Sequence, residues 1–401
     1  SFRNDYAATY GNDYYIDDIS LDKVCSPPPG TIIINCPDPE YKNNYWHGTI
    51  DNDWEKPGNW TGGFVPDRGE DIEFATELNN PTIADVPNSG PAKEDLHLGA
   101  DRVIGDLIND SDKDLWVTTG DQLTINGAVK DGYTDGGTFV VKASPDEPSG
   151  TLIFADPSNN GNVGATVEFY NQAYDCADCG YFTRSWQYFG IPVSESGFPY
   201  LNPKVETINE WMENVDGNKW VPVTTDLKAF RGYEMTNRST DKPDHIYEFK
   251  GILNVGDASV SLTKTPNVNY SGMNLIGNSF TAAIPIDKNA IKYNDGTVAD
   301  AVYLFNTGTC DQWRKLNGGN VPNVVSGTYT SVPLEVGGQA GLPNSIPSMH
   351  TFMVEAKSNT NIDLIYSTLV KNEAGEGQSA WRSAEQNDKQ EIPHIVLDVI
   401  G

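Results

Sequence analysis

The sequence has little positive charge and no long apolar segment, and each shortage excludes a class of protein. Lys and Arg together number 27 against 56 Asp and Glu, which gives a formal net charge of -29. A surface of that sign repels the phosphate backbone of nucleic acids, so we expect no nucleic-acid partner. No apolar run reaches the roughly 18 residues that a membrane-crossing helix needs, so we predict no membrane span in this chain.

Catalytic and metal-binding patterns are also missing. No two of the five histidines have the HxH or HExxH spacing of metal ligands. The glycine patterns of serine hydrolases, P-loop proteins and dinucleotide-binding proteins do not occur. A polysaccharide-acting enzyme needs only two carboxylates about 5 to 10 Å apart. Glu73 and Glu168 are the visible candidates, and we interpret both as ordinary outward-facing strand positions. We therefore predict that the chain is not an enzyme.

Cysteines are few and fall into two local pairs and a single residue. Cys25 and Cys36 bracket SPPPGTIIIN, Cys176 and Cys179 form CADC, and Cys310 stands alone. Such pairs suit small-loop disulfides in an exported protein. The alternative for CADC is a redox motif, but no βαβ pattern surrounds it. A zinc site built from two CxxC motifs is excluded because the chain has one.

The first half of the chain contains short apolar segments separated by turn residues. Glycine, Asp, Asn and Pro fill the intervals, and no helical period appears between the segments. This pattern is typical of a solenoid or a sandwich, and we predict a short, β-helix-like β-solenoid over residues 25–175. The predicted strand cores are 102–104, 115–117, 123–125, 138–141, 151–154 and 165–169.

From residue 176 onward the apolar segments are longer and alternate more clearly with polar residues. We predict an all-β chain in which a β-sandwich domain over residues 176–401 follows the solenoid. The stretch ILNVGDASVSL predicts a hairpin with its turn at residues 255–257. Residues 204–212 (KVETINEWM) predict one short helix.

The beginning of the chain carries the alternating stretch GNDYYIDDISL. It resembles the last strand of jelly-roll domains in bacterial surface proteins, which often end in a similar phrase. The resemblance implies that residues 1–24 are the tail strand of an upstream domain. We expect the chain to be a fragment of a longer multidomain protein.

Two further stretches resemble secreted surface proteins of Bacteroidetes. Trp54, Asn59-Trp60, Val65-Pro66 and the GEDIEF segment resemble the opening of their β-solenoid regions. GMNLIGNSFTAAIPI resembles their GWNLIGNPYPAPID phrase, and WQYFGIPVSE resembles a companion phrase that opens the same β-sandwich. Met273 and Ser279 depart from the usual Trp and Pro, which are packing or turn differences. The resemblance implies a type IX-secreted or adhesin-like protein at the cell surface and names no activity.

Three tryptophans gather near the start of the predicted solenoid. Trp46, Trp54 and Trp60 stand among Asp, Asn and Gly in YWHGTIDNDWEKPGNW. Because the end of a solenoid must be covered, we interpret them as a cap. The alternative is a platform for a sugar ring, and Trp211 and Trp220 form a second candidate pair for carbohydrate.

Calcium is the one cofactor that the sequence suggests, and otherwise we expect none. Asp110, Asp112 and Asp114 occupy alternate positions, as the ligands of an EF-hand loop do. Leu115 stands where that loop needs its glycine, and Asp121 stands where it needs a bidentate Glu. An acidic turn between two strands explains the pattern as well. Residues 51–53 (DND) are a second, weaker candidate.

Composition and strand spacing indicate an all-β protein compatible with export. With the lineage and location that the resemblance implies, we predict a non-enzymatic, extracellular structural or adhesive segment of a bacterial surface protein. The expected partner is an extracellular protein or a glycan ligand. The alternatives that stay open are a carbohydrate-binding module and, after it, a polysaccharide-acting enzyme.

Overall fold

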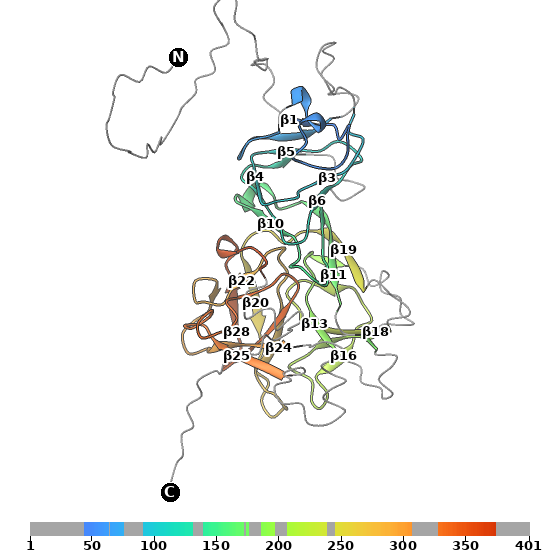
Figure 1. Ribbon diagram of the computed structural model, residues 1–401. Helices are drawn as coiled ribbons and strands as arrows, with labels where there is room; N and C mark the ends of the chain where they lie inside the picture. Colours follow the sequence, from blue (N-terminus) through green and yellow to red (C-terminus); the bar gives the residue numbers. More distant parts are fainter. Residues whose placement is uncertain are drawn as a thin grey trace, which may run out of the picture. The chain divides into compact units, whose positions relative to one another are not determined.

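In the computed structural model, short β-strands follow one another along the described chain (Figure 1). The residues described are 44–63, 65–75, 91–130, 139–171, 174–175, 186–196, 207–238, 245–306 and 328–373. Their regular structure is β-strand with four short 3-10 turns, so the all-β prediction is confirmed. No helix in these segments is long and apolar enough to cross a membrane.

The first ten strands form three parallel sheets that the chain visits in rotation, and we call residues 44–154 the three-sheet coil. One sheet runs β3, β6, β9, the second runs β4, β7, β10, and the third runs β1, β2, β5, β8. The bounds are β1 Asn44–Trp46, β2 Ile72–Phe74, β3 Leu96–His97, β4 Arg102–Ile104, β5 Leu107–Ile108, β6 Leu115–Val117, β7 Gln122–Ile125, β8 Val129–Lys130, β9 Phe139–Val141 and β10 Thr151–Phe154.

Parallel pairing stacks like side chains along the interior of the coil. Leu96, Leu115 and Phe139 are register partners on consecutive turns, and all three are buried. A second sheet repeats the arrangement with other buried side chains, where Ile125 pairs with both Ile104 and Phe154. Each turn of the coil therefore buries its apolar side chains on its neighbours, which is why strands of two to four residues suffice.

Aspartates at the corners of the coil bond to the backbone of the following turn. Asp71 Oδ1 accepts a hydrogen bond from Asp106 N at 2.7 Å, and Asp106 Oδ1 accepts one from Ala128 N at 2.8 Å. A Cβ at Gly127 would lie 2.0 Å from Asp106 Oδ1, so this approach requires glycine. Other corners repeat the contact, with Asp95 accepting from Asp114 N and Asp101 accepting from Gln122 N. Part of the chain's acidity thus serves to join one turn to the next.

Replacing Asp106 with alanine is expected to lower the free energy of unfolding by about 1.5 to 3 kcal/mol, since a charge-assisted hydrogen bond is lost. The Lys130 ion pair and the Ala128 amide hold the pKa of Asp106 below its usual value, which fits a carboxylate that the fold uses. Asp110→Ala is the control because Asp110 is exposed. Urea unfolding of both variants tests this expectation, and equal stabilities would contradict it.

The strand β11 (Gly164–Tyr170) joins the coil to the rest of the described chain. It pairs in parallel with β9 and antiparallel with β19, over seven residue pairs in the latter case. Further sheets follow the orders β12-β18-β15-β16 with β13 on β18, β21-β27-β24-β25 and β20-β28-β23, besides the pairs β14-β17 and β22-β26. The bounds are β12 Tyr174–Asp175, β13 Gln187–Phe189, β14 Glu195–Ser196, β15 Thr207–Trp211, β16 Trp220–Pro222, β17 Leu227–Lys228, β18 Tyr233–Arg238, β19 Ile246–Ile252, β20 Ala258–Leu262, β21 Met273–Gly277, β22 Ile284–Pro285, β23 Ile291–Lys292, β24 Val298–Asn306, β25 Thr328–Pro333, β26 Ser345–Ile346, β27 Thr351–Ala356 and β28 Thr360–Leu364.

Buried hydrogen bonds connect the last turn of the coil to the strands that follow. Thr281 Oγ1 donates to Leu152 O at 2.6 Å, and Tyr366 Oη accepts from Phe154 N at 3.2 Å. Asn372 Nδ2 donates to Gly150 O at 3.1 Å. Apolar side chains from both regions form one buried cluster, so the structure has a continuous core across residue 175, where the predicted domain boundary lies.

Two local predictions in the second region are wrong. Residues 207–211 form β15, which pairs with β16 and β18, where a short helix over 204–212 was predicted. The predicted hairpin around residues 255–257 does not form, because β19 pairs with β11 and β20 pairs with β28. In both cases pairing with other strands decides the structure. The stretch predicted as a tail strand in residues 1–24 lies outside the described residues.

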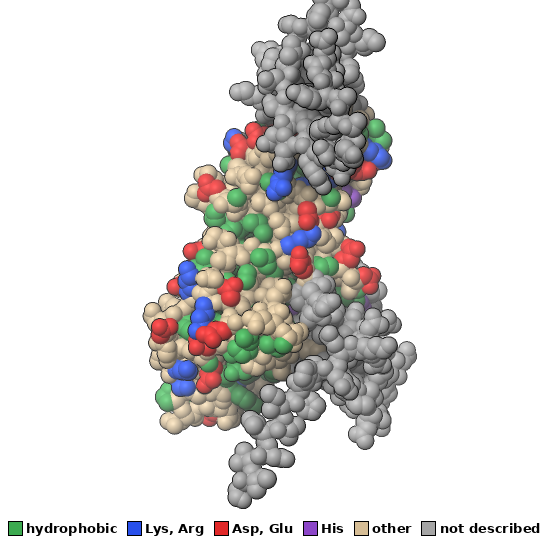
Figure 2. Space-filling view, turned by 60° about the vertical axis from the view of Figure 1, so that its left-hand side comes forward, with side chains coloured by type: hydrophobic (Ala, Val, Ile, Leu, Met, Phe, Trp, Pro, Cys, Tyr) green, Lys and Arg blue, Asp and Glu red, His purple; other side chains and the backbone are tan. Residues whose placement is uncertain are grey.

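Charged side chains of both signs share the surface of the described segments. On the face shown in Figure 2, acidic and basic side chains are interspersed among polar and apolar ones. Ion pairs such as Lys371 with Asp101 (2.6 Å) and Lys288 with Glu335 (3.3 Å) use some of the acids. The acidic residues on this face therefore do not form one continuous patch of a single sign.

Candidate functional site

The three tryptophans of the opening segment are core residues of the coil. Trp46, Trp54 and Trp60 are 0%, 2% and 0% exposed. The Trp60 ring lies 5.0 Å from each of the other two in edge-to-face contact, and its Nε1 donates to Trp54 O at 2.7 Å. A ring without an exposed face has no surface for a sugar, so this placement favours the cap interpretation.

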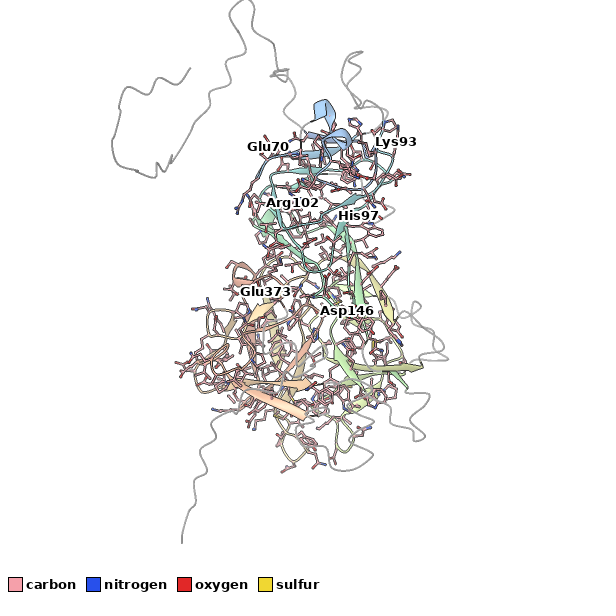
Figure 3. The ribbon with its side chains drawn as sticks, in the orientation of Figure 1. Glu70, Lys93, His97, Arg102, Asp146 and Glu373 are labelled. Atoms are coloured by element: carbon pink, nitrogen blue, oxygen red, sulfur yellow. The ribbon has the colours of Figure 1, made fainter. Side chains whose placement is uncertain are left out.

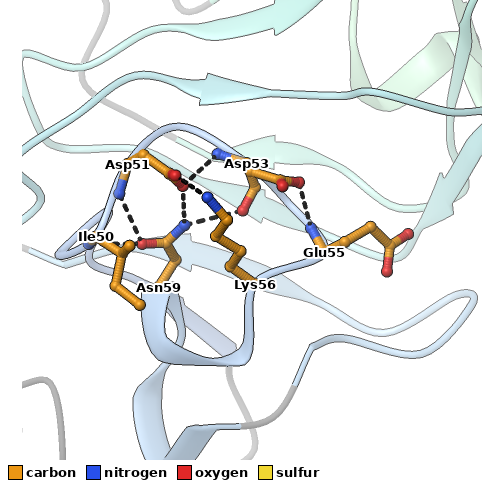
Figure 4. Close-up of polar contacts among 6 residues, drawn as sticks. All are labelled: Ile50, Asp51, Asp53, Glu55, Lys56 and Asn59. Atoms are coloured by element: carbon orange, nitrogen blue, oxygen red, sulfur yellow. Dashed lines mark hydrogen bonds and ion pairs between the residues drawn. The ribbon is translucent and has the colours of Figure 1, made fainter.

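A hydrogen-bond network around Asn59 holds the loop between these tryptophans (Figure 4). The buried Asn59 side chain accepts from Ile50 N at 2.8 Å and donates to Asp53 O at 2.9 Å and Asp51 Oδ1 at 3.0 Å. The pKa of Asp51 is lowered by Lys56, which bonds to it, and by Asn59. Both carboxylate oxygens of Asp51, which was weighed as a calcium ligand, therefore already bond to Asn59 and Lys56 within the loop.

Asp110, Asp112 and Asp114 do not gather around a common point. Asn109 organises their turn through Ser111 N and Lys113 O, and Asp112 pairs with Lys113 at 3.5 Å. Within the described residues, no three His, Cys, Asp or Glu side chains stand close enough to hold a metal ion. Calcium binding here stays a prediction, and the described geometry gives it no ligand set. Cys25, Cys36, Cys176, Cys179 and Cys310 lie outside the described residues.

The two carboxylates weighed for a polysaccharide-acting enzyme alternate with core residues of their strands, as outward-facing positions do, but both are buried. Glu73 is 7% exposed and Glu168 is 5% exposed. Glu168 forms an ion pair with Lys142 and accepts from Ala143 N at 3.2 Å. Alternation within a single strand indicates the side to which a residue points, and not whether that side is covered.

The histidines of the coil also have structural surroundings. His97 stacks on Trp116 with 4.4 Å between ring centres, and burial lowers its pKa; Figure 3 labels His97 and Arg102 in the coil. His47 is buried, with its Nε2 at 2.6 Å from Thr61 Oγ1. His394 lies outside the described residues.

The second tryptophan pair lies beside a partly exposed cleft. Trp211 and Trp220 are in edge-to-face contact at 5.3 Å, and Trp211 Nε1 donates to Met273 O at 2.7 Å. Trp220 lines a cleft of ~500 Å³, which we call the aromatic cleft. The cleft residues are Trp186, Tyr188, Asn209, Asn218, Trp220, Pro222, Glu234 and Phe305.

One row of register partners supplies half of these side chains. Tyr188 on β13 pairs with Glu234 on β18, which pairs with Asn209 on β15, which pairs with Pro222 on β16. Register partners point to the same side of a sheet. Four strands therefore place an aromatic ring, a carboxyl group, an amide and a proline side by side. The neighbour Phe189 points to the other side, where it is fully buried.

Aromatic rings enclose the Tyr188 end of the row. The Tyr188 ring stacks on Phe305 with centres 4.1 Å apart and meets the Trp220 ring at 4.8 Å, tilted by 57°. Tyr329 Oη donates to Tyr188 Oη at 3.4 Å. Burial raises the pKa of Tyr188 far above its usual value, so this hydroxyl stays protonated.

Glu234 is the ionisable carboxyl of the row, and it is 6% exposed. Asn209 Nδ2 donates to its Oε1 at 2.8 Å. Burial raises the pKa of Glu234 to about 7, and the Asn209 hydrogen bond opposes that rise. The group is therefore poised to exist in both protonation states near neutral pH.

This pKa predicts a pH dependence of stability. Because the folded pKa is raised above the ordinary 4.5, the contribution of Glu234 is fully present below pH 4.5 and is lost as the pH rises through about 7. The loss is at most about 3 kcal/mol. We expect the wild type to lose more stability across this range than Glu234→Gln, which lacks this titrating group. A wild type as insensitive as the variant would contradict the assignment.

Comparison with known proteins places the chain in a family. Residues 45–401 match the sequence profile described as "Domain of unknown function (DUF8693)". The chain belongs to this family. It is also 49% identical to the minor fimbrium subunit Mfa5 of Porphyromonas gingivalis, over 94% of this chain. The chain spans 32% of that relative's length, about a third. No solved structure matches it.

Most of the aromatic cleft was missed by reasoning from sequence. Trp220 was a candidate for carbohydrate, but Tyr188, Glu234, Asn209 and Phe305 were not. These residues come from strands far apart in the sequence, and cross-strand register brings them together. The burial of Gln187 and Phe189 on either side of Tyr188 appears only in the structure, because the stretch QYF does not alternate between polar and apolar residues.

Proposed function

We propose that the chain is a non-enzymatic segment of an extracellular bacterial surface appendage, with a structural or adhesive role. The observation that carries the proposal is the 49% identity to a minor fimbrium subunit across nearly the whole chain. Because the chain spans about a third of that relative, the role proposed is that of a segment.

The packing of the described residues supports a structural role. An appendage outside the cell must hold its shape without the help of chaperones inside the cell. The buried bonds from Phe154 to Tyr366 and from Thr281 to Leu152 tie the coil to the strands beyond it. The shared apolar core also joins the two regions.

We also infer a finer description of the fold. The three-sheet coil has the strand rotation, parallel register and stacked interior of a short β-solenoid. The antiparallel sheets that contain β21, β27 and β24 on one side and β20 and β28 on the other fit a β-sandwich. Both assignments fit a structural segment of an appendage.

Location and partners follow from the same relationship. A fimbrial segment lies at the cell surface, and its first partners are other protein subunits of the appendage. The acidic composition, with 56 Asp and Glu against 27 Lys and Arg, suits a protein that stays dispersed in an aqueous medium.

Immunogold labelling of intact cells of the source organism tests the proposal. Antibodies against residues 45–373 are expected to label filaments at the cell surface. The control is a strain that lacks the gene, which must show no label. Label confined to the interior of opened cells would refute the proposal.

A further inference from the structure

We propose that the aromatic cleft binds a neutral saccharide, with Trp220 stacking on a sugar ring and Glu234 and Asn218 bonding to its hydroxyl groups. The proposal deepens the adhesive part of the proposed function. It rests on the proposed function for the extracellular location of the ligand, and on the residues of the cleft for the chemistry of the ligand.

The four aromatic rings of the cleft are half-buried, so each keeps part of its surface open to solvent. Trp186, Tyr188, Trp220 and Phe305 are each partly exposed, whereas Trp46 is completely buried. A soluble protein gains little by keeping several large rings together at a cleft, so such a cluster usually marks a binding site. The C–H face of a pyranose is an apolar surface of the right size for an indole ring.

Polar groups with spare hydrogen-bonding capacity lie beside the rings. Asn209 occupies Oε1 of Glu234, and Oε2 has no hydrogen-bond partner among the described residues. Asn218 Oδ1 accepts from Trp220 N at 3.2 Å, which leaves the Asn218 amide hydrogens to donate. One strong acceptor and one donor beside an aromatic face suit a hydroxyl group, which both donates and accepts.

The charge of the cleft argues against other ligands. Among the described residues that line it there is no Lys, Arg or His to balance an anionic ligand. A quaternary ammonium would need open ring faces around it. Phe305 covers one face of Tyr188, and the amide donor of Asn218 would meet no acceptor on such a cation. A neutral, hydroxyl-rich ligand uses all the groups that are present.

The cleft is also rigid before any ligand arrives. Tyr188, Glu234 and Asn209 stand on three hydrogen-bonded strands, and the sheet fixes their spacing. Tyr188 is further held between Phe305 and Trp220. A preformed site loses little conformational entropy on binding, which favours recognition of weakly binding sugars.

An array of immobilised neutral oligosaccharides tests the proposal, with calorimetric titration of the strongest binder into the whole chain. We expect saturable binding that Trp220→Ala and Glu234→Gln each weaken by about tenfold or more. Tyr270→Ala is the control, because Tyr270 is 68% exposed and does not line the cleft; its affinity should equal that of the wild type. Glu234→Gln keeps the shape of the side chain, so it stays informative if Trp220→Ala fails to fold.

Three results would overturn the proposal. The first is the absence of binding to every neutral oligosaccharide. The second is equal affinities of the wild type and a folded Glu234→Gln chain. The third is saturable binding of tetramethylammonium or anionic glycans, and not of neutral glycans, that the cleft variants abolish. The titration uses the isolated chain, so its outcome does not depend on surface labelling. A cleft that binds sugar in a protein absent from filaments would refute the appendage role and leave this inference standing.

Discussion

Replacing Trp60 with alanine is expected to lower the free energy of unfolding by about 3 to 5 kcal/mol. The ring is fully buried between Trp46 and Trp54, and its Nε1 donates to Trp54 O. Removing it leaves a large cavity where the coil begins, removes two edge-to-face contacts and leaves the Trp54 carbonyl without that donor. Urea unfolding of the whole chain measures the difference.

Two companion variants make this measurement decisive. Tyr270→Ala removes a ring that is 68% exposed and should change stability by no more than about 0.5 kcal/mol. Trp60→Phe should recover part of the loss, because it fills part of the cavity. If Trp60→Ala costs less than about 1 kcal/mol, the ring is not a core residue and the cap interpretation fails.

Replacing Glu213 with glutamine is expected to cost about 3 kcal/mol, the second large effect. The buried carboxylate accepts four hydrogen bonds from the loop that connects β20 and β21. Oε1 accepts from Thr265 N at 2.8 Å and Gly272 N at 2.7 Å, and Oε2 accepts from the Thr263 and Thr265 hydroxyls at 2.8 Å each. A glutamine could keep its oxygen toward the two backbone amides, but the threonine hydroxyls would lose their charged acceptor and all four bonds would lose the assistance of the charge.

The same carboxylate predicts stability that disappears in acid. Burial alone would raise the pKa of Glu213, but the hydrogen bonds from Gly272 and Thr265 outweigh it and lower the pKa to about 2. Because the folded pKa lies below the ordinary 4.5, this stability is present above pH 4.5 and is lost as the pH falls through about 2. The loss is at most about 3 kcal/mol, opposite in direction to the effect of Glu234.

Urea unfolding at a series of pH values separates the two groups. Between about pH 4.5 and 2 the wild type should lose more stability than Glu213→Gln, and the two curves should converge in acid. Parallel curves would show that the carboxylate of Glu213 is not the group that the loop depends on.

Local strand positions in the coil were predictable because each depends on its own residues. The apolar cores at 115–117 and 151–154 coincide with β6 and β10, and turn residues bound them on both sides. The order in which strands pair was not predictable, because β7 bonds to strands from the turns before and after it, and short apolar segments are interchangeable in composition.

The predictions failed where long-range pairing overrides local pattern. Residues 207–211 have a helical spacing of apolar side chains, yet β18 and β16 on either side make them a strand. The stretch from β19 to β20 carries good hairpin residues, yet β19 completes the sheet of β11. The aromatic cleft was not predicted for the same reason, since only the pairing register of the strands brings Tyr188, Glu234 and Asn209 side by side.

The central claim is that this chain is a segment of a surface appendage, and purification of sheared filaments tests it most directly. Filaments are removed from cells by shear, washed in high salt and analysed by immunoblot with antibodies against residues 45–373. We expect the protein to sediment with the filaments and to remain with them after washing. Recovery of the protein with the cell bodies or in the soluble wash, with none on the filaments, would contradict the account.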